Sequence, residues 1–206
     1  MTSIERLTEL FKDFPGIGPR QAKRFVYFLL TRPESYRREL ISHIENIKNN
    51  IQACASCFRF FEATSVSQKV CSVCSNPNRD NSSLLIVSRD IDFENIERSR
   101  SFNGTYFILG GSIPILEKNP ELKIRAKELA SVVKKKASES GLKEIIIALN
   151  ANPEGENTAQ FVTKFLEPLT NEFGLKVSTL GRGLSTGTEI EYSDSETIKN
   201  AIKNRF

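Results

Sequence analysis

All four cysteines of this 206-residue chain lie within one stretch of 21 residues. They form two Cys-x-x-Cys pairs, Cys54 with Cys57 and Cys71 with Cys74, separated by thirteen residues. Each pair lets one tight turn present two thiolates, and two such turns can surround one tetrahedral metal ion. Four sulfur ligands leave no open position for water or substrate. The spacing therefore predicts a structural Zn²⁺ site in a small, loop-rich module between two longer segments.

The cysteines have two other interpretations, four reduced thiols in a small core or a pair of disulfides. Met1–Arg6 runs directly into an amphipathic segment and does not resemble an export signal, so we expect a reducing compartment in which disulfides are disfavoured. The longest apolar run, Ile145–Leu149, is far shorter than the roughly 20 residues that cross a bilayer. We therefore expect a cytoplasmic protein without a membrane partner.

Hydrophobic periodicity divides the chain into three blocks. Residues 1–50 have helical spacing, broken at Phe14–Pro19 by Pro and Gly. After the cysteine module, apolar strands alternate with helices expected at 121–140 and 156–172, which predicts a mainly parallel α/β sheet with small additional modules. The expected strands are Leu84–Val87, Tyr106–Leu109, Ile145–Leu149 and Lys176–Leu180.

The turn at Pro15–Arg20 carries two glycines and opens onto a predicted helix. Gly16 and Gly18 permit a close backbone approach, and the free N–H groups at a helix start favour an anion such as phosphate. The basic residues of the first helical turns are Arg20, Lys23 and Arg24. This pattern is typical of a helix-hairpin-helix that binds the nucleic-acid backbone without reading bases. A plain interhelical turn, or a hairpin used for protein contacts, remains an alternative.

The α/β block shows an incomplete set of catalytic residues. The one histidine, His43, falls on a predicted N-terminal helix, where we expect a surface residue. Strand 145–149 is followed by Asn150 and Asn152, neutral amides where a magnesium site needs carboxylates. Glu154 and Glu156 come next, at a helix start that favours acidic side chains for structural reasons.

The first strand of this block also lacks a carboxylate where it ends. Ser88 follows it directly, and the acidic residues beyond are Asp90, Asp92 and Glu97. We expect Asp90 and Asp92 to cap the next helix. The pattern therefore argues against Mg²⁺-dependent catalysis.

Several motifs, in order, resemble the RecR family of bacterial recombination mediators over nearly the whole chain. Phe14–Pro19 resembles the helix-hairpin-helix of that family, and the cysteine pairs followed by Asn78–Asp80 resemble its zinc finger. The remaining matching segments are Gly104–Gly111 with Ile113 and Pro114, Ala148–Asn150 with Glu154–Ala159, Gly183–Asp194, and Thr197–Arg205. The second of these resembles the most recognisable motif of its Toprim domain.

The chain departs from the family pattern in three places. The insert between the cysteine pairs is longer than expected, which predicts a longer finger tip. Ser88 stands where Toprim proteins usually have a glutamate, and Ser185-Thr186 stand where the family more often has a turn with proline. The change at Ser88 further weakens a catalytic interpretation.

The resemblance implies a non-enzymatic DNA clamp with four parts. These are a helix-hairpin-helix domain at 1–52, a four-cysteine zinc finger at 53–79, a Toprim domain at 80–180 and a C-terminal oligomerisation segment at 181–206. It implies a ring, as a homotetramer, that binds single- and double-stranded DNA through Arg20, Lys23 and Arg24. It also implies RecO-like and RecF-like partners that help load recombinase onto single strands, with Glu154 and Glu156 as a docking surface for a basic partner.

Two other classes of function stay open at this level. One is a Toprim nuclease or primase-like enzyme that uses Glu154, Glu156 and Asp92 with Mg²⁺. The other is an oligomeric scaffold whose hairpin and cysteine module only build the assembly. Metal-dependent nicking would favour the first, and failure to bind DNA would favour the second.

Overall fold

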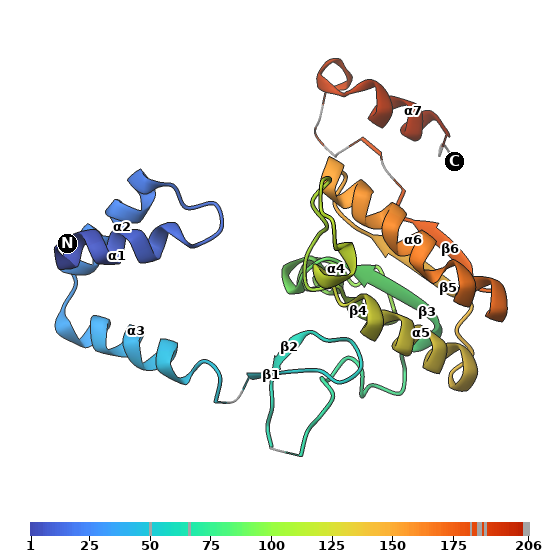
Figure 1. The fold of residues 1–206 in the computed structure, drawn as a ribbon, viewed down its shortest axis with the longest axis horizontal. Coiled ribbons are helices and arrows are strands. Elements are labelled where there is room, and N and C mark those ends of the chain that lie inside the picture. The colour runs from blue at the N-terminus through green and yellow to red at the C-terminus, as the bar shows by residue number, and fades with distance from the viewer. Residues whose placement is uncertain (50, 66, 182, 185–186, 188, 204–206) are drawn as a thin grey trace. The chain divides into compact units, whose positions relative to one another are not determined.

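The computed structural model describes the chain except for residues 50, 66, 182, 185, 186, 188 and 204–206. The chain divides into two compact units, 1–51 and 52–206 (Figure 1). The departure expected at Ser185-Thr186 lies outside the described residues.

The first unit contains three helices, α1 (Ser3–Lys12), α2 (Pro19–Leu30) and α3 (Glu34–Asn46). A capping box between Thr2 and Glu5 begins α1. Helices α1 and α2 pack through an edge-on contact of Phe11 and Phe25, whose ring centroids lie 5.8 Å apart. No residue of helix α3 is fully buried, although Tyr36 packs edge-on against Phe28 of α2.

The cysteine module opens the second unit with a two-stranded sheet, β1 (Ile51–Ala53) and β2 (Phe60–Glu62). The main sheet follows, with parallel strands in the order β4-β3-β5-β6. Its strands are β3 (Asp80–Val87), β4 (Gly104–Ile108), β5 (Glu144–Ala148) and β6 (Lys176–Thr179). The connecting helices are α4 (Asp90–Ser99), the short 3₁₀ helix η1 (Pro120–Leu122), α5 (Ala126–Glu139) and α6 (Pro153–Phe173). The predicted α/β fold class is confirmed.

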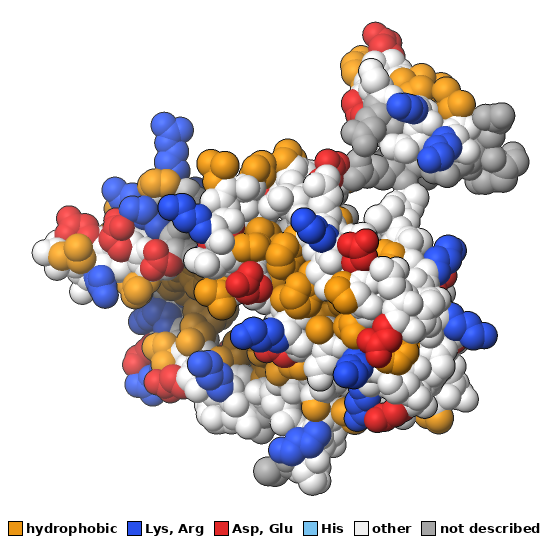
Figure 2. Space-filling model, turned by 45° about the vertical axis from the view of Figure 1, so that its right-hand side comes forward, with side chains coloured by type: hydrophobic (Ala, Val, Ile, Leu, Met, Phe, Trp, Pro, Cys, Tyr) orange, Lys and Arg blue, Asp and Glu red, His pale blue; other side chains and the backbone are white. Residues whose placement is uncertain are grey.

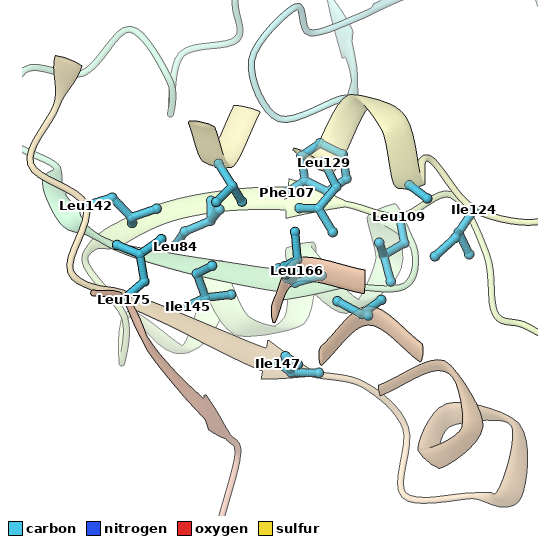
Figure 3. Close-up of a cluster of buried hydrophobic side chains, with 14 of the residues drawn as sticks. Leu84, Phe107, Leu109, Ile124, Leu129, Leu142, Ile145, Ile147, Leu166 and Leu175 are labelled. Carbon is cyan, nitrogen blue, oxygen red and sulfur yellow. The ribbon is translucent and has the colours of Figure 1, made fainter. Parts of the chain in front are cut away.

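Both faces of the second half of strand β3, Leu84–Val87, are buried, which explains why this half reads as a continuous apolar run. Leu84 and Ile86 point into a core shared with α5 and α6, where Leu129 and Leu166 are completely buried (Figure 3). Leu85 and Val87 belong to a second core, together with Phe93 of α4, Tyr106 and three of the four cysteines. The cysteine module is therefore part of the packing of the main sheet.

Three element boundaries differ from the sequence predictions by three residues or more. Strand β3 begins at Asp80 instead of Leu84, because Asp80 pairs with Gly104 of β4 and Ser83 pairs with Glu144 of β5, with an irregular register between Asp80 and Leu84. The helix expected from 121 begins only at Ala126, after η1. Helix α6 starts at Pro153 instead of 156, because Asn152 caps it by accepting a hydrogen bond from the Gly155 N–H at 2.8 Å.

The C-terminal part contains a 3₁₀ helix, η2 (Ile190–Tyr192), and the amphipathic helix α7 (Ser195–Lys203). None of the helices in the described part of the chain is long and apolar enough to span a membrane.

Candidate metal centre and nucleic-acid interface

The four cysteine sulfurs gather at one point between the two turns that carry them. All four Sγ atoms lie within 4.8 Å of one another, and the Sγ atoms of Cys57 and Cys71 are 3.7 Å apart. Cys54, Cys57 and Cys71 are buried, and Cys74 is half-buried. The predicted cysteines therefore come together as reduced thiols, without a disulfide among them.

This cluster has the dimensions of a four-sulfur metal site. Zn–S bonds of about 2.3 Å in a tetrahedron place sulfurs about 3.8 Å apart, close to the Cys57–Cys71 separation. The sulfurs also perturb one another: contact with Cys57 lowers the pKa of Cys54, and contact with Cys54 raises the pKa of Cys57. Because four thiolates this close repel one another, all four can ionise only if a cation balances their charge. The Cys71 N–H donates to the Cys54 Sγ at 3.3 Å, as amides commonly do to a metal-bound thiolate.

The cysteine module is joined to the main sheet by main-chain and side-chain contacts. The Ile108 N–H of β4 donates to the Cys57 carbonyl at 2.9 Å. The ring of Phe58 packs on Phe107, with centroids 5.3 Å apart. The Asp90 Oδ1 accepts a hydrogen bond from the Phe60 N–H at 2.8 Å. The expectation that Asp90 caps its own helix is therefore wrong, whereas Asp92 does so by accepting from the Arg89 N–H at 3.0 Å.

A half-buried ion pair fixes the exit of the cysteine module, and sequence reasoning missed it. Arg79 pairs with Glu97 of α4, and the Tyr106 hydroxyl donates to the other Glu97 oxygen at 2.9 Å. Burial alone would raise the pKa of Glu97, but hydrogen bonds from Arg79 and Tyr106 outweigh it and lower that pKa. Glu97 thus serves packing and lies away from the strand ends where catalysis would occur. Nothing local in the sequence pairs residues 79 and 97.

The hairpin turn between α1 and α2 has the geometry that its glycines predict. Gly16 adopts a φ of +77°, in the left-handed region that favours glycine. Gly18 begins α2, with Pro19 as its first residue and no side-chain cap. A Cβ placed on Gly18 would meet no heavy atom within 4 Å, so packing in the described structure does not require a glycine there. The start of α2 is therefore open to an external acceptor.

The basic residues behind this turn differ in how they are engaged. Arg20, Lys23 and Arg24 are exposed on α2, and none forms an ion pair within the described residues. Arg24 makes only a long hydrogen bond, 3.4 Å, to the Gln21 side chain. By contrast, Lys12 of α1 and Arg38 of α3 pair with carboxylates of their own helices. The cations nearest the turn are thus the ones available to phosphate.

The carboxyl ends of the strands lack a cluster of carboxylates in the described structure. Ser88 is buried at the end of β3, and its Oγ lies 3.5 Å from the Oγ of Ser112. Asn152 is engaged in capping α6, so it does not project as a metal ligand. His43 lies exposed on α3, in the other unit, as expected.

Glu154 and Glu156 lie on different sides of the first turn of α6. Glu156 lines a cleft of about 620 Å³ together with Asn150, Gln160 and, from α7, Asn200 and Lys203. Glu154 is exposed on the other side, where its carbonyl accepts a hydrogen bond from the Thr158 hydroxyl at 2.6 Å. The two carboxylates that the sequence groups into one surface therefore face different neighbours.

Comparisons with known proteins cover the same elements. A family model described as "RecR, helix-hairpin-helix" matches residues 4–48, a Toprim domain model matches 82–181, and one described as "RecR, C-terminal" matches 183–205. Recombination protein RecR of Bifidobacterium longum subsp. infantis is 36% identical over 205 residues, covering 98% of this chain and 95% of the relative. The RecR proteins of Bifidobacterium adolescentis and Bifidobacterium animalis subsp. lactis are 35% and 33% identical, with the same coverage.

The helix-hairpin-helix, the four-cysteine cluster and the Toprim sheet together define a recombination and repair protein of modular build. The match to these relatives covers 98% of this chain and 95% of the length of each relative. It belongs to the RecR family.

Proposed function

We propose that this protein is a DNA-binding clamp that assists recombinational repair. The single observation that carries this proposal is the open start of α2 at Gly18, beside which Arg20, Lys23 and Arg24 form no ion pair with any described residue. Such a surface binds phosphates on either single- or double-stranded DNA without reading bases. Gly16 and Gly18 would allow the DNA backbone to approach the turn.

The cysteine cluster is proposed to hold Zn²⁺ through Cys54, Cys57, Cys71 and Cys74. The supporting observations are the sulfur spacing and the amide donated to Cys54. With four sulfur ligands the ion would have a structural role, holding two turns that pack on β4. No reaction step is assigned to it.

The proposed clamp is a homo-oligomer, in the form of a tetrameric ring. The first unit exposes apolar side chains on all three helices, among them Leu10 (49%), Leu30 (57%) and Ile44 (61%). Figure 2 shows apolar side chains beside Lys and Arg on the C-terminal part of the chain, which carries α7. Ile202 of α7 is 58% exposed. Exposed apolar surface at both ends of a chain suits a head-to-tail or paired assembly. A ring repeats a weak basic surface several times, which multiplies its affinity for DNA.

The partners proposed from the family are RecO-like and RecF-like repair proteins. The proposed localisation of the protein is the cytoplasm. Glu154 and Glu156 are the acidic residues offered for docking a basic partner. We assign no catalysis to the Toprim domain, since Ser88 replaces the expected glutamate and Asn152 is used as a helix cap. We assign DNA binding to residues 1–52, zinc binding to 53–79, partner binding to 80–180 and oligomerisation to 181–206.

The proposal is tested by measuring the affinity of the zinc-loaded protein for single- and double-stranded DNA across a salt series. Arg20→Ala and Arg24→Ala should each weaken binding and reduce the slope of log K against log [salt] by roughly 1 for each phosphate that is no longer bound. Arg98→Ala, an exposed change on α4, is the matched control and should leave both unchanged.

Light scattering in parallel gives the molar mass of each variant. If the wild-type oligomer binds no DNA, or if both hairpin variants bind as well as wild type, the hairpin is an assembly element and the scaffold function replaces the clamp. Mg²⁺-dependent nicking that Glu154→Gln abolishes would instead establish an enzyme.

A further inference from the structure

The proposed zinc centre has more negative charge than its own ion balances. Four thiolates around one Zn²⁺ leave a net charge of two negative units. Three of the four cysteines are buried, so water cannot fully solvate this charge. The N–H that Cys71 donates to the Cys54 Sγ is a dipole and adds no net positive charge. A nearby cation of the protein would therefore stabilise the loaded centre.

The arginines closest in sequence to the cysteines already have partners on α4. The guanidinium of Arg59 lies over the Phe93 ring, with its Cζ atom 4.4 Å from the ring centroid. Arg79 pairs with Glu97. Both side chains thus hold the cysteine module against α4, and the compensating cation has to be sought on another element.

Lys136, in the last turn of α5, has no such partner. It is half-buried, and no carboxylate in the described part of the chain forms a salt bridge with it. It follows Leu129 and Val132 at helical spacing, on the side of α5 that packs on the main core. Its carbonyl accepts hydrogen bonds from the N–H groups of Ser140 and Leu142 at 3.0 and 3.3 Å, which fixes this end of the helix.

The packing brings this side of α5 and the cysteine module to the same core. Phe58, the residue directly after Cys57, packs against the cluster of buried side chains that contains Leu129 of α5. The charges of Cys74 and Cys57 act on the Lys136 ammonium: burial lowers the pKa of Lys136, and these two cysteines oppose that fall. The lysine therefore lies within electrostatic reach of one cysteine from each pair.

Interaction with the helix dipole does not account for the half-buried position of Lys136. A lysine near a helix C-terminus is favourable when it is exposed, and Lys134 and Lys135 of the same helix are exposed. Removing an ammonium group from water is unfavourable unless a negative group compensates it. Among the described residues, the cysteine cluster supplies that negative group.

We propose that Lys136 is the charge partner of the zinc centre, and that its ammonium offsets part of the charge of Cys74 and Cys57 and so helps to retain the metal. The inference rests on the proposed zinc site and adds to it a residue outside the cysteine module. Lys136 does not ligate the ion, so its effect is on affinity alone. Because it belongs to α5, the packing of the cysteine module on the Toprim domain would itself strengthen zinc binding.

The test is the zinc affinity of the full-length protein at neutral pH, measured by competition with a chromophoric chelator. Lys136→Met removes the charge at similar volume and should weaken zinc binding roughly 10–100-fold, the usual effect of losing a group that supports metal ligands. Lys136→Arg keeps the charge and should bind zinc nearly as wild type does, whereas Lys136→Glu should bind it more weakly than Lys136→Met. Lys135→Met is the matched control, since it removes an exposed lysine of the same helix and should leave the affinity unchanged.

Circular dichroism and DNA affinity at saturating zinc should be the same in all these variants, because the fold and the hairpin are intact once the metal is bound. Equal zinc affinities of Lys136→Met and Lys135→Met would overturn this inference and leave the proposed function intact. A loss in Lys136→Arg as large as that in Lys136→Met would also overturn it, by showing that shape and not charge matters at this position. A wild-type protein that binds no zinc would refute both the charge partner and the proposed zinc site.

Discussion

Replacing Glu97 by Ala measures what the largely buried cluster of Arg79, Glu97 and Tyr106 contributes to the second unit. The side chain of Arg79 is only 10% exposed, and without Glu97 its guanidinium would retain a 3.4 Å hydrogen bond to the Phe102 carbonyl and its contact with the Tyr106 ring. Its Nε already lacks a partner among the described residues. The Tyr106 hydroxyl would lose its acceptor as well.

Stranding a buried charge typically costs about 3–5 kcal/mol. For a unit of the size of 52–206, each kcal/mol lowers Tm by about 3 °C, so we expect a fall of roughly 9–15 °C. Thermal and urea unfolding of the zinc-loaded protein at neutral pH, followed by circular dichroism, gives the difference directly. The double variant Arg79→Met with Glu97→Met should show a much smaller fall in Tm, because it removes both charges and keeps a similar side-chain volume.

The pH dependence of this difference follows from the lowered pKa of Glu97. A carboxyl group with a lowered pKa in the folded state stabilises the protein above its unfolded pKa of about 4.3, and that stabilisation is lost as the pH falls through the folded-state pKa. The difference in free energy of unfolding between wild type and Glu97→Ala should therefore be largest at neutral pH and should decrease below about pH 4. The reasoning fails if the single variant costs less than about 1 kcal/mol, or if the double variant is the less stable of the two.

Two further predictions concern the elements around the sheet. Removing zinc with a chelator, or replacing Cys71 by Ser, should lower the Tm of the second unit, and acid should release the metal because protonated thiols do not bind it. A colorimetric zinc assay, run alongside the unfolding curves, measures the release. Release of the metal without any loss of stability would contradict this prediction. Thr158→Val should destabilise the protein by about 1–3 kcal/mol, since the buried Ile113 N–H loses its acceptor, whereas Thr158→Ser should retain most of the stability in the same urea titration.

Sequence reasoning reached those parts of the structure that depend on local spacing. A few neighbouring residues are enough to predict the cysteine cluster, the hairpin turn and the apolar strands. Boundaries set by partners elsewhere were missed: the polar start of β3 is a strand because Asp80 aligns with Gly104 of β4 and Ser83 aligns with Glu144 of β5. A pattern confined to one segment cannot contain that information.

The candidate sites show the same limit. Asp90 looks like a helix cap in sequence, but its carboxylate is used by the Phe60 N–H thirty residues earlier. The pairing of Arg79 with Glu97 and the separation of Glu154 from Glu156 likewise depend on which elements the fold brings together. Only the second could have been anticipated, since two residues apart on a helix point in nearly opposite directions.

The hydrogen bond from Ile108 to the Cys57 carbonyl has a consequence for the behaviour of the protein in the cell. Strand β4 is the edge of the main sheet, and all five of its residues are buried. An uncovered apolar edge of this kind is a template on which other chains can add strands and aggregate. The Cys57 carbonyl engages one amide of that edge, so loss of the proposed zinc ion would free this amide as well as lower the stability of the fold. Under zinc starvation or thiol oxidation, this protein is expected to precipitate before it unfolds completely.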